Sequence, residues 1–516
     1  MDNLEIQIAR DYHDGTRHPG GVLLNPYHRY GPHQRPELFK LYKGLPPIPL
    51  PLEAAPPGSP GVGALGAIAG EAGSEGEQGK VDFRVLARLL HYSAGVTKYL
   101  HYPPPWGRMP FRAAACTGAL YHIELYLVCG DLPGLAAGVY HYDPQASALR
   151  RLRQGDYRQA LLAASAGEPG LARAPAALAL TDVFKRNAVK YQAREYRHAF
   201  WDSGVILANT LAVSDALGLP SRVVLGFLDE AVGQLLGLHP EEELPLAVVP
   251  LGSDAEANIP DATPLAPLEL EIEPYARYLP DFPAIRAMHQ ASSLPDAHAV
   301  SGWRAHTAQF EFPEPAGPLI ELRPLAPGEL PTDPIESVIE RRGSTRKFSR
   351  APIRFEQLST MLETSVRGLN ADFTGDSDTR LTTAYLIANV VDGLAPGAYA
   401  YHPDHGGLEL LKSGDFRDAA GYLALNQDLG ADASAAVFFL ADLEAVLARW
   451  GNRGYRAAQL DASVAAGRIY LAAYSLGFGA TGLTFFDDAV IEFFSPHARG
   501  QSVMFLIALG KKATQI

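Results

Sequence analysis

The segment LAAGVYHYDPQASALRRLRQGDYRQAL, residues 135–161, recurs as LAPGAYAYHPDHGGLELLKSGDFRDAA at residues 394–420. Twelve of the 27 positions are identical without a gap. The same offset of 259 residues relates further pairs: Tyr196 and Tyr455, Arg197 and Arg456, Asp202 and Asp461, Leu217 and Leu476, Asp229 and Asp488. Because separate blocks share one offset, a whole domain has been duplicated. The period is too long for a solenoid, whose repeats span about 20–50 residues.

Each repeat carries the same order of expected secondary structure. A helix comes first, at residues 82–91 and 354–364. Two strands follow, and the alternating tyrosines of GVYHYD and GAYAYH suit a half-buried sheet. A long helix comes next, at residues 195–217 and 454–476, and its apolar residues lie on nearly all sides, as is typical of a helix at the centre of a domain or dimer. Short apolar strands close each repeat, so the order predicts an α+β fold.

The composition is that of a soluble globular protein and excludes several functional classes. The chain is 47% hydrophobic and has a formal net charge of −13, and such an acidic surface repels nucleic acid. Two cysteines, Cys116 and Cys129, are too few for a disulfide framework or a four-cysteine zinc site and favour the reducing cytoplasm. The N-terminus lacks the apolar core of a signal peptide, and no apolar run is long enough to predict a membrane span.

The repeats divide the chain into five expected segments. Residues 1–52, rich in His, Tyr and Pro, are predicted to form an extended arm on a larger body. Residues 53–79 are of low complexity, and their Gly and Pro content predicts a flexible surface loop. The first domain is expected at 80–252 and the second at 334–516, with a Pro-rich surface connection at 253–333.

The stretch Glu340–Phe348, ERRGSTRKF, places four cations within seven residues of an acidic protein. Arginine forks and a serine hydroxyl match phosphate oxygens, although charge runs are often only solvated helix ends. The stretch resembles the Arg-x-Ser-x-Arg-x-Phe element of the nitroreductase superfamily, which holds the phosphate of flavin mononucleotide (FMN). The resemblance assigns that role to Arg342, Ser344 and Arg346. The first repeat has no such element before its first helix, so one FMN per chain is expected.

In that family two subunits share each flavin, so the resemblance implies two fused nitroreductase-like domains that form an intrachain pseudo-dimer. The first repeat would then supply the segment against the flavin ring. Residues 112–120 resemble it, with Ala115 and Cys116 in place of Pro and Ser. Small residues there let the backbone approach a flat ring, and a buried structural turn is the alternative. The residues implied are Cys116, Thr117, Gly118 and Ala119. Cys116 is not expected to be a redox nucleophile, because no neighbouring group is evident that would lower its pKa.

Residues 477–486, GFGATGLTFF, resemble the family segment whose backbone faces the flavin ring near N5. The residues implied are Ala480, Thr481, Gly482 and Leu483. Lys511 and Lys512, after the last strand, occupy the place of a second phosphate-binding cation in the family. Terminal lysines are also commonly just exposed to solvent, and both interpretations stay open here.

Lys190-Tyr191, in VKYQAREYRHAF, resembles the Lys-Tyr element of SagB-type azoline dehydrogenases, which is implicated in removing a substrate proton while hydride passes to FMN. Either side chain would act as a base only with a depressed pKa, since ordinary values lie near about 10. The alternative is a surface lysine beside a packing tyrosine. The offset of 259 places Arg449-Trp450 at the matching position of the second repeat, so the two copies have diverged.

Two further patterns carry no prediction of a site. Gly61–Gly66 matches G-x-G-x-x-G, but it follows PPGSP in a low-complexity loop instead of a strand. No metal site is expected, because the early histidines lack paired ligand spacing: His13, His18, His28 and His33.

The resemblance favours an FMN-dependent oxidoreductase, a dehydrogenase of the azoline-oxidase type acting on a peptidic or small heterocyclic substrate, with Lys190 and Tyr191 as catalytic residues. One alternative is an NAD(P)H-dependent reductase of nitro compounds or quinones. Another is a non-catalytic binding scaffold on the same fold. A chain that contains its own pseudo-dimer is expected to be a monomer, with a homodimer as the alternative.

Overall fold

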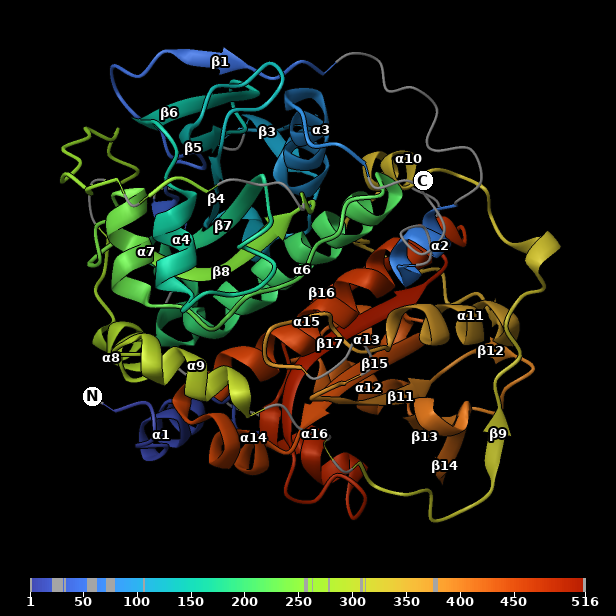
Figure 1. Ribbon diagram of the computed structural model, residues 1–516. Coiled ribbons are helices and arrows are strands. Elements are labelled where there is room, and N and C mark those ends of the chain that lie inside the picture. The colour runs from blue at the N-terminus through green and yellow to red at the C-terminus, as the bar shows by residue number, and fades with distance from the viewer. Residues whose placement is uncertain are drawn as a thin grey trace.

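The computed structural model describes residues 2–20, 31, 34–52, 63–70, 79–104, 107–254, 259–261, 263–276, 279–306, 310, 312–374 and 379–513. Figure 1 shows two lobes, the first repeat above and the second below, with one long helix from each running side by side between them. The α+β prediction is confirmed, since each lobe is an antiparallel sheet layered with helices.

The first lobe is built on a six-stranded sheet of order β1-β6-β5-β4-β7-β8. Alternate residues of β4 enter two separate apolar clusters, Leu125 and Leu127 on one face and Tyr126 and Val128 on the other. Both faces of this sheet are therefore covered, which explains why β4 is buried along its whole length. The strands are β1 (Pro47–Pro49), β4 (Ile123–Cys129), β5 (Gly138–Asp143), β6 (Ala148–Gln154), β7 (Ala176–Asp182) and β8 (Leu244–Leu251), and the helices are α3 (Phe83–Ala94), α4 (Arg158–Ala164), α5 (Phe184–Tyr191), α6 (Glu195–Ala216) and α7 (Asp229–Leu236).

The second lobe repeats this plan in a seven-stranded sheet of order β16-β17-β15-β11-β13-β14-β9. Tyr126 of β4 and its repeat mate Tyr385 of β11 pair with corresponding strands: Tyr126 lies opposite Ala179 of β7, and Tyr385 lies opposite Phe438, the repeat mate of Ala179. The strands are β9 (Leu319–Glu321), β11 (Thr383–Ala388), β13 (Gly397–His402), β14 (Gly407–Ser413), β15 (Ala435–Ala441), β16 (Gly479–Leu483) and β17 (Ser502–Gly510), and a small pair is β10 (Ile353–Arg354) with β12 (Val391–Asp392). The helices are α11 (Phe355–Ser365), α12 (Arg417–Leu423), α13 (Asp428–Asp432), α14 (Leu443–Trp450), α15 (Asn452–Ser475) and α16 (Asp487–Phe494).

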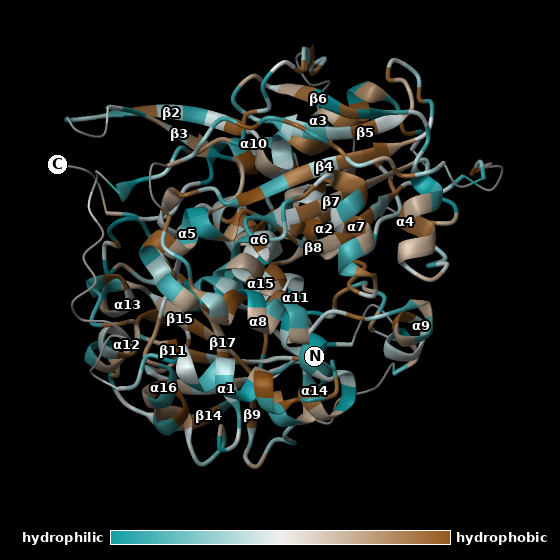
Figure 2. Ribbon diagram, turned by 90° about the vertical axis from the view of Figure 1, so that its left-hand side faces the viewer, coloured by the Kyte–Doolittle hydropathy of each residue, from teal (hydrophilic) through white to brown (hydrophobic). Residues whose placement is uncertain are grey.

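The long helices α6 and α15 cross at repeat-related positions. A Cβ on Gly204 would collide with Ser463, and a Cβ on Gly467 would lie 2.6 Å from the Cβ of Ala208. Gly204 and Ser463 are repeat mates, and so are Ala208 and Gly467, so the crossing lies on a local pseudo-two-fold axis. Small residues at the crossing let the two backbones touch. Figure 2 shows these central helices enclosed by the two lobes.

The N-terminal arm and the connection are themselves copies of one another, which the sequence interpretation missed. The arm is not simply extended: α1 (Gln7–Gly15) is a helix, and its counterpart in the connection is α8 (Pro283–Ala291). Strand β1 pairs with β6, and β9 pairs with the repeat mate β14. The first residues of β1 and β9 are 272 residues apart (319 − 47), and so are the first residues of α3 and α11 (355 − 83). The offset then falls to 259 residues (382 − 123 for the mates Ile123 and Thr382) because the first lobe contains an additional hairpin, β2 (Val96–Tyr102) and β3 (Gly107–Arg112). The connection also carries α9 (Ala297–Ala305).

The predicted flexible loop also contains structure. Residues Ala64–Ala69 form α2, whose Leu65 and Ile68 are buried in the main core. The spacing of 272 makes α2 the counterpart of α10 (Ile335–Arg341), the helix that precedes the basic stretch of the second lobe. Burial of its small apolar residues between α6 and α15 stabilises this short helix, which composition alone does not predict. The rest of the predicted loop, 53–62 and 71–78, lies outside the described residues.

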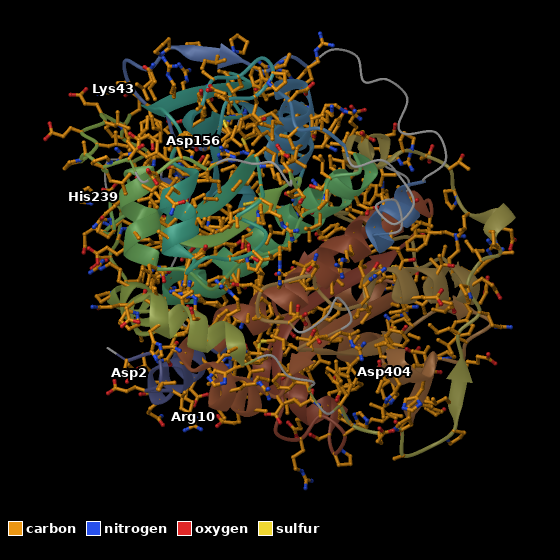
Figure 3. All side chains as sticks on the ribbon, viewed as in Figure 1. Asp2, Arg10, Lys43, Asp156, His239 and Asp404 are labelled. Carbon is orange, nitrogen blue, oxygen red and sulfur yellow. The ribbon has the colours of Figure 1, made fainter. Side chains whose placement is uncertain are left out.

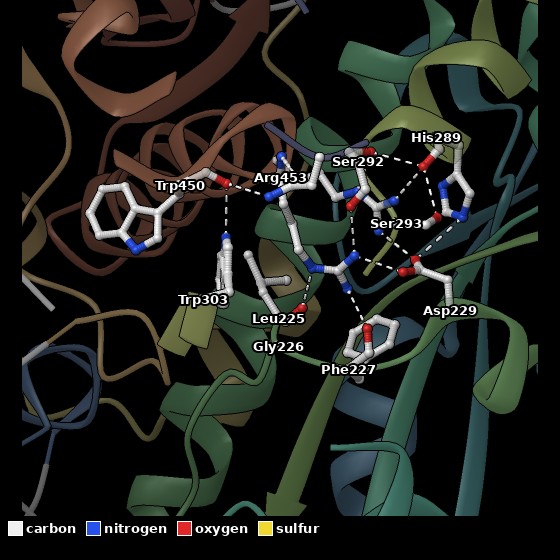
Figure 4. A network of polar contacts seen from close by, with 12 residues as sticks. Leu225, Gly226, Phe227, Asp229, His289, Ser292, Ser293, Trp303, Trp450 and Arg453 are labelled. Carbon is white, nitrogen blue, oxygen red and sulfur yellow. Dashed lines mark hydrogen bonds and ion pairs between the residues drawn. The ribbon is translucent and has the colours of Figure 1, made fainter. Parts of the chain in front are cut away.

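Two buried ion clusters lock the lobes together. Arg453 and Arg456, at the start of α15, each donate from Nη1 to Asp229 of the first lobe at 2.6 Å, as Figure 4 shows for Arg453. In the mirrored cluster Arg197 of α6 and Arg194, the N-cap residue of this helix, donate from Nη1 to Asp487 of the second lobe at 2.6 and 3.0 Å. Burial alone would raise the pKa of Asp487, but the two arginines lower it to about 2. Each cluster therefore joins the helix of one lobe to an aspartate of the other.

The helices α1 and α8 cap these clusters in the same way. Arg197 donates from Nε to Thr16 Oγ1 and from Nη2 to the carbonyl of His13. Arg456 donates likewise to Ser292 Oγ and to the carbonyl of His289. The shared pattern is Arg-x-x-His-x-x-Thr/Ser, residues 10–16 and 286–292. Because α1 contacts the second lobe and α8 the first, the two copies exchange their N-terminal helices (Figure 1).

The charged surface lies outside this locked core. Figure 3 shows Asp2, Lys43, His239 and Asp404 at the periphery, and all four are exposed. Among the described residues, no helix combines the length and the apolar character needed to cross a bilayer.

Candidate active site

Arg342 joins the two lobes at the end of α10. Its side chain is buried, and it donates from Nε to the carbonyl of Ala113 at 2.9 Å and from Nη2 to the carbonyl of Arg112 at 3.0 Å, both in the first lobe. Its Nη1 is buried without a partner among the described residues. A buried guanidinium donor left unpaired is costly unless a ligand accepts from it.

Other cations gather around Arg342. Lys98 of β2 donates from Nζ to the carbonyl of Arg342 at 2.8 Å, and burial, Arg342 and Lys512 together lower its pKa. Lys512 Nζ lies 3.9 Å from the ring centroid of Tyr474, and its chain lies against Gly479. Arg346 is exposed. Lys511 contributes a carbonyl that accepts from the backbone N–H of Ser349, and Lys511 and Lys512 are both exposed.

The basic stretch and β16 form one unit. Ser344 pairs with Ala480 in a parallel bridge, and the N–H of Thr345 donates to the carbonyl of Ala480 at 2.9 Å. Tyr470 of α15 holds both, because its hydroxyl accepts from the N–H of Gly482 and lies 3.5 Å from Ser344 Oγ. The structure thus brings together the two second-lobe segments that the resemblance selected, with Thr481 and Leu483 buried in β16.

The first-lobe segment is a turn of left-handed backbone. Gly118 has φ 62° and Ala119 φ 51°, and Gly118 is exposed. Asp202 of α6 holds the turn by accepting from the Thr117 N–H at 2.9 Å and from Thr117 Oγ1 at 2.6 Å. Cys116 is turned inward, and its thiol donates to Asp202 at 3.0 Å. Burial and the neighbouring Asp202 raise the pKa of Cys116.

Lys190 and Tyr191, at the end of α5, converge on this turn. A Cβ on Gly118 would lie 3.0 Å from Tyr191 Oη and 3.2 Å from Lys190 Nζ, so both side-chain ends lie against this glycine, whose positive φ disfavours any other residue. Burial and the charge of Arg346 lower the pKa of Lys190. The Lys-Tyr pair of the first lobe therefore lies within electrostatic reach of the basic stretch of the second.

The matching pair in the second lobe has a different environment. Trp450 is buried and stacks on Phe310 at 5.4 Å between centroids. Arg449 donates from Nε to the carbonyl of His306 at 2.7 Å. The two form part of the packing beside α9, so the divergence inferred from sequence is also a divergence of surroundings.

A buried polar network beneath the turn was not foreseen. His122 contacts Asp202 through Nε2 at 2.8 Å and Asp182 through Nδ1 at 2.7 Å, with Glu195 at 3.2 Å. Burial alone would lower the pKa of His122, but these carboxylates raise it well above its ordinary value. Burial and Asp182 raise the pKa of Glu195. We infer a charged imidazolium that fixes Asp202, and through it the Thr117–Ala119 turn.

His198 is a second unforeseen residue. Its ring lies 4.2 Å from that of Tyr191 and stacks on Trp201 at 4.7 Å. Burial, followed by Arg194, lowers its pKa well below the ordinary value, so the ring is neutral. His122 and His198 are separated in the sequence and adjoin the site only in the fold. The one sequence clue was that both stand beside segments already selected, His122 after 112–120 and His198 after the Lys-Tyr pair.

The early histidines do not gather as a metal site among the described residues. His13 contacts the hydroxyl of Tyr455 at 3.3 Å and belongs to an ion cluster, whereas His28 and His33 lie outside the described residues. Three other groups have ligand atoms within 4.8 Å of one another: Cys116, His122 and Asp202; His122, Asp182 and Glu195; His402, Glu409 and His497.

Residues 80–253 and 339–511 match the model of the nitroreductase family. The chain belongs to the nitroreductase family. A solved structure from Anabaena variabilis, described as a nitroreductase, is similar over 98% of this chain and 99% of its own, with 27% sequence identity and a TM-score of 0.76. This nitroreductase chain therefore consists of two fused domains that form an intrachain pseudo-dimer, as the resemblance predicted.

Two curated relatives match this nitroreductase over single domains. A Methanocaldococcus jannaschii protein named as a nitroreductase is 26% identical over 173 residues, 34% of this chain and 81% of the relative. The microcin B17-processing protein McbC of Escherichia coli is 29% identical over 174 residues, 33% of this chain and 61% of McbC. The predicted likeness to SagB-type proteins is confirmed by this match.

Proposed function

We propose that this nitroreductase is an FMN-dependent dehydrogenase that oxidises an azoline-type ring in a modified peptide or small heterocycle. The observation that carries the proposal is the convergence of Lys190 and Tyr191 on Gly118, beside the basic stretch of the opposite lobe. McbC, a relative that processes microcin B17, supports a peptidic substrate.

The residues present fit FMN. The buried, unpaired Nη1 of Arg342 and the cations Lys98, Arg346 and Lys512 suit a phosphate group. Ser344 Oγ would add a hydroxyl donor. The backbone of Ala480–Leu483 and the Cys116–Ala119 turn would flank the ring from the two lobes. Bound FMN would supply a two-electron acceptor, the chemistry that side chains lack.

The side chains of the first lobe would handle the proton. Lys190 has a lowered pKa, so a larger fraction of its amine is neutral near pH 7, as a base requires. Tyr191 Oη, beside it, would orient the substrate by a hydrogen bond. His122 and Asp202 would act through the Thr117–Ala119 turn and hold the substrate-facing backbone in place.

The first test is the visible spectrum of the purified chain, with the released cofactor identified and counted. We expect one FMN per chain, slow bleaching by NADH or NADPH, and reoxidation by oxygen after turnover of an azoline-containing peptide. Rapid bleaching by NAD(P)H without azoline turnover would instead assign a reductase of nitro compounds or quinones. A colourless chain that cannot be reconstituted with FMN would contradict both and indicate a binding scaffold.

A further inference from the structure

A cavity of about 610 Å³ lies where the pseudo-two-fold axis would place a second copy of the candidate active site. Leu211 and Asp215 of α6 line it, and they are the repeat mates of Tyr470 and Tyr474. Ser253, the mate of Lys512, lines it as well. In Figure 2, α5 and the β2–β3 hairpin lie to the left of α6, whereas α2, which borders this cavity, lies on the other side.

The candidate active site lies on one flank of the α6–α15 crossing, the first flank, and the cavity lies on the other, the second flank. The cavity lacks the phosphate-binding residues of the first flank. Gly70, at the end of α2, occupies the position that corresponds to Arg342 at the end of α10. Ser253 occupies the position that corresponds to Lys512. Four arginines from other positions line it instead: Arg173, Arg222, Arg367 and Arg468. The repeat mate of Arg468 is Asn209, which donates from Nδ2 to the carbonyl of Tyr92, so this charge is particular to the second flank.

Arg468 is the decisive residue. Its side chain is only 9% exposed, and it donates from Nη1 to the carbonyls of Arg367 and Gly368, each at 3.1 Å. Among the described residues, neither Arg468 nor Arg367 has a carboxylate within ion-pair distance. Burial and the neighbouring Arg367 lower the pKa of Arg468 to about 10, against a smaller opposing effect of Asp461. A buried cation beside a second cation is costly unless an anion neutralises it.

We propose that this cavity binds a small phosphorylated molecule, with Arg468 and Arg367 holding the phosphate. Guanidinium groups bind phosphate through paired charge-assisted hydrogen bonds. The apolar wall of Ile68, Ala212 and Pro220 would take the uncharged part of the ligand. The volume lies within the range of about 300–1,000 Å³ that small-molecule sites occupy. A second FMN and another phosphorylated metabolite share this chemistry.

The test is calorimetric titration of the FMN-saturated chain with inorganic pyrophosphate at constant ionic strength. We expect binding that Arg468→Asn, which installs the residue of the first repeat, weakens at least about tenfold. Arg499→Gln, which removes an exposed charge elsewhere, should leave the affinity unchanged. Equal affinity in wild type and Arg468→Asn, or no pyrophosphate binding to a wild-type chain that holds only one FMN, overturns the proposal.

Three further measurements keep the result decisive. If Arg468→Asn does not fold, Arg173→Gln, at an exposed position on the rim, should weaken pyrophosphate severalfold, and unchanged affinity there overturns the proposal. Unchanged pyrophosphate affinity in Arg342→Met would exclude binding at the first flank, and a loss of affinity in that variant would overturn the proposal. Two FMN per chain that fall to one in Arg468→Asn would identify flavin as the ligand. One FMN with retained pyrophosphate binding would identify another phosphorylated molecule.

Discussion

The two flanks of the α6–α15 crossing are related by the duplication but differ in the charged groups of the described residues that distinguish their sites. The first flank has Arg342 and Lys512 from one lobe and Lys190 from the other. The second has Gly70 and Ser253 at two of these places, and its charge comes from Arg468 and Arg367. The helix crossing and the arginines of the ion clusters, in contrast, correspond in both halves, although the aspartate of the second cluster, Asp487, lies one residue before the repeat mate of Asp229. The difference teaches that a fused pair must keep its interface symmetric but not its sites.

The largest effect is expected at the Lys-Tyr pair, where the two repeats differ. Lys190→Ala should lower turnover of an azoline substrate by about 10²–10⁴-fold, because general-base catalysis contributes that much. Arg449→Ala, at the matching position of the second repeat, should leave turnover unchanged. Rates are measured with FMN content confirmed by absorbance for both variants. Equal rates for wild type and Lys190→Ala, with FMN bound, would remove Lys190 from the mechanism.

The next largest effect tests the two buried ion clusters that join the lobes. Asp229→Asn and Asp487→Asn should each lower the free energy of unfolding by about 3–5 kcal/mol, because each leaves two buried arginines without a counter-ion. Urea denaturation measures both. Asp488→Asn, whose carboxylate pairs with Arg17 near the surface, is the matched control and should cost less than about 1 kcal/mol. Strongly unequal losses for the two buried aspartates would show that only one cluster locks the lobes.

A third variant sharpens the difference between the flanks. Arg342→Met should weaken FMN binding at least about 30-fold, since it removes a buried charged donor and its bonds to the first lobe. Its neighbour Arg341, half-exposed and paired with Asp333 at 2.7 Å, provides the control Arg341→Gln. Flavin fluorescence quenching gives both dissociation constants. Equal Kd values for the two variants would place the phosphate elsewhere.

The smallest expected effect concerns pH and should be alike in both halves. Burial, followed by Arg197 for His13 and Arg456 for His289, lowers the pKa of both rings well below 6.5. Their stabilising contribution is therefore complete above pH 6.5 and is lost as pH falls, since the unfolded chain then binds protons that the folded chain does not. Each should cost about 1 kcal/mol at pH 5.5.

Urea midpoints at pH 7.5 and 5.5 measure this loss. His13→Gln and His289→Gln should each reduce the difference between the two midpoints by a similar amount. A midpoint difference that neither substitution alters would assign the acid sensitivity to other groups. Below about pH 4 a further loss follows, because the pKa of Asp487, held at about 2 against burial by Arg194 and Arg197, lies below its unfolded value.

Much of the architecture was predictable because duplication leaves a record in local pattern. The offset of 259 predicted the duplication and the order of elements predicted the α+β class, whereas the pseudo-dimer was implied by the family resemblance. The bounds of the two long helices differ from those expected by at most two residues. The copy of α1 as α8 escaped notice because the β2–β3 hairpin changes the offset before each domain. Helix α2 escaped notice because its alanines and glycines carry no amphipathic pattern.

By itself the sequence determined that two copies exist, that one carries a basic stretch and that the other carries Lys190-Tyr191. Only the tertiary structure decided that Lys190 and Tyr191 lie against Gly118 near the basic stretch, that Asp202 and His122 hold this turn, and that Arg468 is buried with no carboxylate of the described residues within ion-pair distance. The physical reason is that periodicity and residue type report local backbone preference. Desolvation and ion pairing depend on which distant segments pack together, and no short window of sequence contains both partners.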